Sequence, residues 1–138
     1  DFVLDNSVAM RWLLETSKVA DQHYAGEVLD SLLNGCAIVL NLRHLGASNV
    51  LLSTEKRDEI RLGEIEGFMS QLENLAIQTD TMTSHHAFNR TLTLARAYKL
   101  SSYDAAYLEL AIREGLPLAT LDKGLAKAAS KAGVAMHL

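Results

Sequence analysis

The sequence predicts an α/β fold in which helices cover a parallel sheet of four or five strands. Short apolar runs alternate along the chain with longer segments that repeat apolar residues at helical spacing. This alternation is typical of parallel strands joined by helices. Two of the apolar runs end directly on an aspartate, at Asp5 and at Asp122. Ligand sites in such sheets lie beyond the carboxyl ends of the strands, so these positions are the first candidates for function.

Length and composition fit one globular domain that spans residues 1–138. Hydrophobic residues make up 49% of the chain and charged residues 22%, which is ordinary for a globular protein. The single cysteine excludes an internal disulfide and fits a reducing, cytoplasmic compartment. No run approaches the ~20 apolar residues of a membrane span. A net charge of −4 argues against binding to nucleic acid by bulk electrostatics. A nuclease stays possible, because a bound divalent metal changes the local charge.

In the first half of the chain, short apolar runs predict strands and recurring apolar stripes predict helices. Phe2–Asp5 is the first expected strand, and Ser7–Glu15 follows as a helix with its apolar residues on one side. Ser17 can cap a second helix that runs to about Asn34, and Gly35 suits a left-handed stop. The other elements expected here are a strand at Ala37–Leu40 and helices at about Leu45–Lys56 and Leu62–Leu75.

The second half continues the same alternation. A short strand at Ala76–Gln78 precedes a long helix that starts at Thr83 or Ser84 and ends near Tyr98. Gly115 stops the next helix. The remaining expected elements are that helix at Tyr103–Arg113, a strand at Leu118–Leu121, a helix at Gly124–Lys131 and a last strand at Val134–His137.

Three aspartates form the candidate site. Asp5 and Asp122 each close an apolar run, and Asp104 opens a helix-like stretch. Carboxylates gathered at one edge of a sheet repel one another unless a cation neutralises them. Mg²⁺ takes oxygen ligands, and it usually binds through one or two carboxylates together with substrate phosphates. The pattern therefore favours a metal-dependent enzyme that acts on a phosphate ester. Taken singly, each aspartate could equally be a helix cap or a first-turn acid.

Three segments carry a family resemblance. Val3–Ala9 (VLDNSVA) resembles the opening of PIN-domain ribonucleases, especially the VapC-type toxins of bacterial toxin–antitoxin pairs. Leu100–Leu108 (LSSYDAAYL) is similar to their third acidic motif, and Leu118–Lys123 (LATLDK) to their fourth. The resemblance covers nearly the whole chain. It implies a PIN-like three-layer α/β/α fold.

The resemblance also implies an activity. In the family, an acidic cluster binds one or two Mg²⁺ or Mn²⁺ ions and activates water against an RNA phosphodiester. By resemblance, Asp5, Asp104 and Asp122 are the catalytic and metal-binding residues of an endoribonuclease, neutralised by an antitoxin and assembled as a homodimer. Ser7 and Thr120 are expected to hydrogen-bond the cluster or its waters, and Asn6 lies close enough in sequence to assist.

One position departs from the family pattern. Gly46 stands where the family usually carries a glutamate early in the helix after the second strand, and glycine supplies no ligand. The site could then bind metal weakly, use water in place of the carboxylate, or be inactive. The alternative function is a catalytically impaired PIN scaffold that binds antitoxin or RNA. A phospho-receiver domain fits poorly, because Ala76–Gln78 is not followed by the expected setting of a phospho-accepting aspartate.

Basic and apolar surfaces give two further expectations. Arg11, Arg43 and Lys123 flank the predicted acidic pocket and could bind RNA phosphates, although each also fits a plain surface charge. The helices between Gly46 and Leu75 have more apolar surface than a small sheet can cover. This excess independently favours a homodimer, since two-fold pairs are the commonest closed assemblies.

Overall fold

The computed structural model describes residues 1–41, 46–57 and 60–138 in full and residues 43–45 by their backbone alone. Within these residues, four strands form one parallel sheet in the order β3-β2-β1-β4. The strands are β1 (Phe2–Leu4), β2 (Ala37–Val39), β3 (Ile77–Thr79) and β4 (Leu118–Ala119). The predicted α/β class and its parallel sheet are therefore confirmed.

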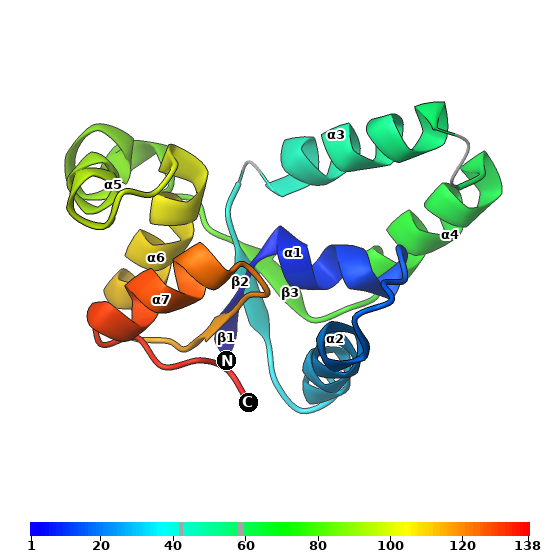
Figure 1. Cartoon of the computed structure of the whole chain (residues 1–138), viewed down its shortest axis with the longest axis horizontal. Coiled ribbons are helices and arrows are strands. Elements are labelled where there is room, and N and C mark those ends of the chain that lie inside the picture. The colour runs from blue at the N-terminus through cyan, green and yellow to red at the C-terminus, as the bar shows by residue number, and fades with distance from the viewer. Residues whose placement is uncertain (42, 58–59) are drawn as a thin grey trace.

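Helices cover both faces of the sheet, as Figure 1 shows. The segments α5, α6 and α7 lie together on one side, while α1 and α2 lie on the other, and α3 and α4 extend outward as an arm (Figure 1). The helices are α1 (Asn6–Ala9), α2 (Val19–Ser31), α3 (Arg43–Lys56), α4 (Leu62–Glu73), α5 (Leu92–Tyr98), α6 (Ser102–Glu114) and α7 (Lys123–Lys131); shorter turns are η1 (Met10–Trp12), η2 (Ser84–His86) and η3 (Ala87–Thr91). No helix in the described part of the chain is both long and apolar enough to cross a membrane.

The sheet separates two apolar cores because side chains alternate between its faces. Val3 points into the core formed with α6 and α7, whereas Phe2 and Leu4 point into the core formed with α1 and α2. All three side chains are fully buried. Strands covered on both faces need continuous apolar runs, which is the pattern that made β1, β2 and β4 recognisable in the sequence.

The C-terminal half differs from prediction in two places. The expected strand Val134–His137 is reduced to a single bridge between Leu118 and Met136. The expected continuous helix that ends near Tyr98 is broken into the 3₁₀ turn η2, the π-helical turn η3 and α5. The side chain of Asn89 accepts the backbone N–H of Arg90 at 2.5 Å inside η3. This bond gives the backbone an alternative partner at the point where the regular helix is interrupted.

The N-terminal half also differs in detail. The helix expected over Ser7–Glu15 is the short α1, which ends at Ala9, followed by the 3₁₀ turn η1, which ends at Trp12. Ser17 was predicted to cap α2, but the capping position is Lys18 and no side chain caps it. Gly35 was predicted to stop α2 in a left-handed turn, but the helix ends at Ser31 in tightened turns, and the backbone N–H of Leu32 donates to the carbonyl of Leu29 at 3.1 Å.

A buried ionic network ties the edge strand β3 to α6. Both terminal guanidinium nitrogens of Arg113 donate to the Asp80 carboxylate, at 3.0 and 2.9 Å, and Arg113 Nε donates to Glu109 at 3.0 Å. Thr83 Oγ1 donates to Asp80 at 2.8 Å. Burial by itself would raise the pKa of Asp80, but the hydrogen bonds and charge of Arg113 outweigh it and hold that pKa below its usual value.

This network predicts a loss of stability in acid. Because the pKa of Asp80 is lower in the folded chain than its unfolded value of about 3.9, the network stabilises the fold above that pH and loses its effect as the pH falls further. We expect Asp80→Asn to lower the free energy of unfolding at neutral pH by about 1–3 kcal/mol. Between about pH 5 and 3 the variant should lose less stability than the native chain.

Urea unfolding at a series of pH values measures both effects. The matched control is Asp30→Asn, because Asp30 is exposed and makes no ion pair within the described residues. A variant whose acid dependence follows that of the native chain would contradict the role assigned to Asp80.

Candidate active site

The candidate site lies where the order of strands in the sheet reverses. From β1 the chain runs outward through β2 to β3, and it then returns to place β4 on the other side of β1. Parallel strands on either side of such a switch point leave a crevice beyond their carboxyl ends. Asp5 directly follows β1, and Thr120 and Asp122 follow β4. The fold therefore brings residues 115 or more positions apart to one edge of the sheet.

Two hydroxyl groups hold the Asp5 carboxylate in place. Ser7 Oγ and Thr120 Oγ1 each donate to Asp5 Oδ2 at 2.7 Å. Asp5 is only 6% exposed, and its backbone N–H donates to the carbonyl of Ala119 at 3.0 Å, which extends the pairing of β1 with β4. The predicted hydrogen bonds of Ser7 and Thr120 to the cluster are confirmed. Asp5 makes no side-chain cap to α1, so capping does not account for its carboxylate.

Asp122 caps helix α7 and also lies at the candidate site. Its Oδ1 accepts the backbone N–H groups of Gly124 at 2.8 Å and Leu125 at 3.1 Å, which caps α7. A Cβ atom at position 124 would lie 3.3 Å from Asp122 Oδ1, so glycine lets the carboxylate fold back closely over the first turn. The backbone N–H of Asp122 donates to Thr120 Oγ1 at 3.0 Å, and this bond links Asp122 to the group that holds Asp5.

Asp104 enters the site from α6. Its backbone N–H donates to Ser101 Oγ at 3.1 Å, and Ser101 is the N-cap of that helix. The residue is partly buried, and its carboxylate forms no ion pair within the described residues. A side-chain hydrogen bond from Ser101 is the one interaction that favours the charged form of this carboxylate. Ser101 was not predicted to matter, although its spacing from Asp104 is that of a helix-capping box, which the sequence displays.

Burial and neighbouring negative charge act on the carboxylates of Asp5 and Asp104. Burial raises the pKa of Asp5 above its usual value, and hydrogen bonds from Ser7 and Thr120 only partly oppose the rise. The charge of Asp122 raises the pKa of Asp5 further. Burial also raises the pKa of Asp104, and the charges of Asp122 and Asp5 add to that rise. The fold thus collects negative charge with no positive partner among the contacts described for these groups, and such a site favours a cation.

The oxygen ligands of the three carboxylates fit a hard cation, but the carboxylates are too far apart to coordinate one ion directly together. In the described residues, no three acidic, histidine or cysteine side chains lie close enough to hold an ion directly between them. Mg²⁺ keeps several of its waters and often takes only one or two carboxylates. The oxygen-only set of Asp5, Asp104 and Asp122 therefore suits Mg²⁺ or Mn²⁺ held partly through water.

Position 46 faces this site. A Cβ atom at Gly46 would lie 3.0 Å from Asn6 Nδ2, and Asn6 directly follows Asp5. A side chain at position 46 would therefore be directed toward the start of α1, where the family's glutamate is expected. The same distance is tight, so any residue larger than glycine requires a small shift of the Asn6 amide.

The predicted RNA-contacting cations are only partly described. The side chain of Arg43 lies outside the described residues. Arg11 and Lys123 make no ion pair with another described residue, and Lys123 is exposed directly beside Asp122. Lys123 therefore remains a candidate for phosphate contact.

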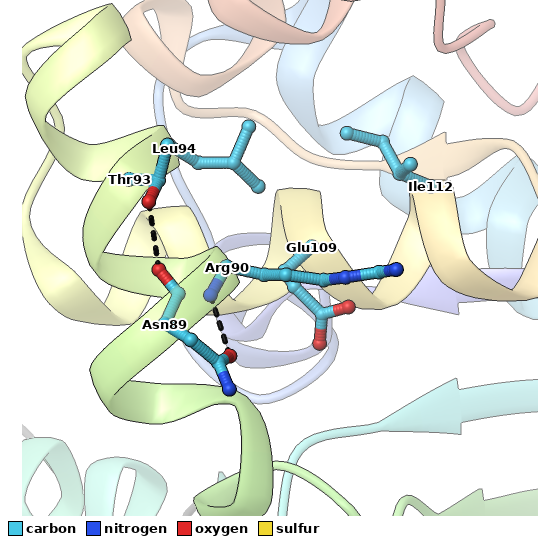
Figure 2. Close-up of a pocket in the computed structure, with 6 residues that line it drawn as sticks. All are labelled: Asn89, Arg90, Thr93, Leu94, Glu109 and Ile112. Atoms are coloured by element: carbon cyan, nitrogen blue, oxygen red, sulfur yellow. Dashed lines mark hydrogen bonds between the residues drawn. The ribbon is translucent and has the colours of Figure 1, made fainter.

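A separate pocket of about 420 Å³ lies between η3, α5 and α6 (Figure 2). Figure 2 shows the Arg90 and Glu109 side chains among those that line the pocket, and the Glu109 carboxylate accepts a hydrogen bond from Arg113. The lining residues are Asn89, Arg90, Thr93, Leu94, Glu109 and Ile112. None of the three aspartates lines it, so the pocket is distinct from the acidic site.

Known structures share this fold at low sequence identity. PAE2754 from Pyrobaculum aerophilum superposes with a TM-score of 0.66 at 19% identity, over 93% of this chain and 78% of that one. FitAcB from Neisseria gonorrhoeae superposes with a TM-score of 0.61 at 17% identity, over 100% of this chain and 97% of that one. No curated protein matches the chain by sequence.

The model of the PIN domain family matches residues 2–131, which include Asp5, Asp104 and Asp122. PIN domains are generally nucleases, so nuclease activity is the class of chemistry that the match supports. The match spans both sheet faces and the switch point at which the acidic residues meet. The chain belongs to the PIN domain family.

Proposed function

We propose that this protein is a metal-dependent endoribonuclease that hydrolyses RNA phosphodiester bonds, with Asp5, Asp104 and Asp122 as its metal-binding residues. The observation that carries the proposal is the placement of Asp5 and Asp122 beyond β1 and β4, at the switch point of a PIN-family sheet, with both charges acting on Asp104. Carboxylates such as Asp5 and Asp104, whose pKa is raised by burial and by neighbouring negative charge, are candidates for a functional site.

Each residue of the site has a distinct task in this proposal. Ser7 and Thr120 fix one oxygen of Asp5, so that its other oxygen keeps a defined direction. Asp122 Oδ1 accepts hydrogen bonds from the first turn of α7, and Oδ2 is the oxygen that would bind a cation or its waters. Asp104 brings a carboxylate from a third element. With Mg²⁺ or Mn²⁺ bound, the site would gain the means to lower the pKa of an attacking water and to stabilise charge on the phosphate.

The motif resemblance also supports a proposal for the protein's cellular role. The segments around Asp5, Asp104 and Asp122 resemble VapC-type toxins, so we propose that the chain is the toxin of a toxin–antitoxin pair and binds a cognate antitoxin. We also propose a homodimer. Large apolar side chains on the arm of α3 and α4 stay exposed, including Leu52 at 54% and Met69 at 50%.

A second candidate function follows from Gly46. The chain lacks the carboxylate that the family usually places in α3, and the three aspartates do not by themselves form a tight metal cluster in the described residues. A PIN scaffold that binds antitoxin or RNA without cleaving it would fit these two observations. Restoring the carboxylate discriminates between the two functions.

We expect Gly46→Glu to strengthen Mn²⁺ binding about tenfold or more and to raise cleavage of single-stranded RNA. The change adds an oxygen ligand at a position that faces the site, and even indirect ligand support is worth about 10–100-fold in metal affinity. Because a Cβ there crowds the Asn6 amide, the double variant Asn6→Ala with Gly46→Glu should gain at least as much. Calorimetric titration with Mn²⁺ and cleavage of a labelled RNA measure the two effects.

The control for this gain is a further change of Asp104→Asn, which should abolish it. If the single and double variants that carry Gly46→Glu both leave metal affinity and cleavage unchanged, position 46 does not serve the site. If the native chain already cleaves RNA at the rate of the restored variants, three aspartates suffice and the scaffold function is excluded.

Asp5→Asn tests the cation site by a readout other than activity. Asparagine keeps an acceptor for the two hydroxyls and removes a buried charge, so in EDTA the variant should unfold about 2–4 °C above the native chain. Millimolar Mn²⁺ should raise the unfolding temperature of the native chain and not that of the variant. Asp30→Asn is the control for an exposed charge. A less stable Asp5→Asn, with a native chain indifferent to Mn²⁺, would count against the site.

The proposed homodimer predicts twice the mass of one chain by light scattering at tens of micromolar. Leu52→Ser on the exposed face of α3 should shift the protein toward the monomer, because it removes apolar area from the arm. Leu33→Ser is the matched control, since Leu33 is also exposed but follows α2. A native chain that is monomeric at this concentration overturns the dimer.

A further inference from the structure

A basic groove lies beside the acidic site, between the C-terminal end of α5 and one face of α7. Its volume is about 440 Å³, and three of its lining residues are the exposed lysines Lys99, Lys127 and Lys131. The rest of the lining is small or uncharged: Ala97, Tyr98, Leu100, Gly124 and Ala128. No acidic side chain is among the described residues that line the groove, although the chain carries a net charge of −4.

The three lysines are not used within the fold. None of them forms an ion pair or a side-chain hydrogen bond with another described residue. Lys127 and Lys131 are one helical turn apart on α7, so their ammonium groups leave the same face of the helix about 6 Å apart along its axis. Lys99 lines the same groove from the end of α5. Like charges held around one hollow favour an anionic ligand with several charges.

Lys99 adds an independent observation. It ends α5 in the left-handed conformation, with φ 55° and ψ 46°, where glycine or asparagine would be favoured. A lysine at this position strains the backbone and supplies a positive charge to the groove. Backbone strain kept at an exposed position is consistent with a use for the side chain.

The groove adjoins both of the helix ends that carry site aspartates. Gly124 lines it and donates its backbone N–H to Asp122. Leu100 also lines it and directly precedes Ser101, the residue that caps the helix of Asp104. In Figure 1, α5, α6 and α7 lie together on one side of the sheet. An RNA strand that presents a phosphodiester to the aspartates would therefore have the basic groove next to it.

We propose that this groove binds the backbone phosphates of single-stranded RNA adjacent to the bond presented to the acidic site. The inference rests on the proposed ribonuclease function and adds a path for the substrate. RNA is favoured over an acidic protein segment because Gly124, which lines the groove, donates its backbone N–H to Asp122, so the groove adjoins a carboxylate that would receive a phosphodiester. Contacts of lysine to phosphate position a strand without reading its sequence.

The test is fluorescence anisotropy with a labelled single-stranded RNA of mixed sequence and about 12 nucleotides. EDTA is present, so that binding is measured without cleavage. Lys127→Gln with Lys131→Gln is compared with Lys18→Gln with Lys56→Gln, which removes the same charge from exposed positions elsewhere. The groove variant should bind about tenfold more weakly than the control variant. Between about 50 and 200 mM salt, the slope of the logarithm of the binding constant against the logarithm of the salt concentration should be smaller in magnitude by roughly 1.4. Each of the two lost phosphate contacts on a single strand contributes about 0.7.

Lys99→Gly is a second variant, which removes a groove charge at a position where glycine is the favoured residue. Glycine relieves the left-handed strain, so the temperature of unfolding should rise while RNA affinity falls. Equal RNA binding by the groove and control variants overturns the proposal, as does a native chain that binds no RNA at about 50 mM salt. A glutamate-rich peptide that binds the native chain as tightly as the RNA and needs the same lysines also overturns it, and assigns the groove to an acidic protein.

These outcomes separate the groove from the nuclease. RNA binding that depends on the lysines, in a chain that never cleaves RNA with Mg²⁺ or Mn²⁺, supports the groove and removes the catalytic proposal. If the groove variants cleave RNA at the native rate and bind it with native affinity, the groove has no role in RNA binding, and the catalytic proposal is unaffected.

Discussion

The Asp5 carboxylate is buried at the point where β1 and β4 end, and the two hydroxyls of Ser7 and Thr120 make that burial tolerable. A buried anion without such donors would cost several kcal/mol. The same two hydroxyls extend the hydrogen-bond network beyond Asp5, because Ser7 Oγ accepts the backbone N–H of Leu121 and Thr120 Oγ1 accepts that of Asp122. One network therefore ends β4, places the start of α7 and holds Asp5 and Asp122 at one edge of the sheet.

The sequence predicts that Asp5 and Asp122 lie at one edge of the sheet, because each follows an apolar run that forms a parallel strand. Apolar runs locate the strands, alternation assigns their faces, and the switch in strand order brings the residues after β1 and β4 together. Strand lengths were less predictable. Leu118–Leu121 reads as one apolar run, yet β4 stops at Ala119, because the next backbone donors turn to Ser7 and Thr120 instead of to a neighbouring strand. Hydrogen bonding, rather than composition, sets that boundary.

Side-chain contacts between distant residues that no strand end brings together could not be predicted. Arg113 and Asp80 are 33 positions apart, and nothing in the pattern around either indicates that β3 and α6 would place them in contact. The basic groove has the same origin. Lys127 and Lys131 look like surface charges on a short helix, and Lys99 looks like a loop residue, until the end of α5 packs beside α7. Such sites depend on tertiary packing, which periodicity along the chain does not encode.

The three aspartates differ in what else they support, and this difference decides what a substitution can reveal. Asp122 holds the first turn of α7, so its removal changes both the cap and the charge. Asparagine caps a helix about as well as aspartate, so it separates the two effects at that position. The helix of Asp104 is capped by Ser101 through the Asp104 backbone, so its carboxylate is not needed for the cap. That carboxylate is partly desolvated and repelled by Asp5 and Asp122, and the hydrogen bond from Ser101 does not offset these effects. Asp104 is therefore the residue at which the site's chemistry can be tested with the least disturbance of the fold.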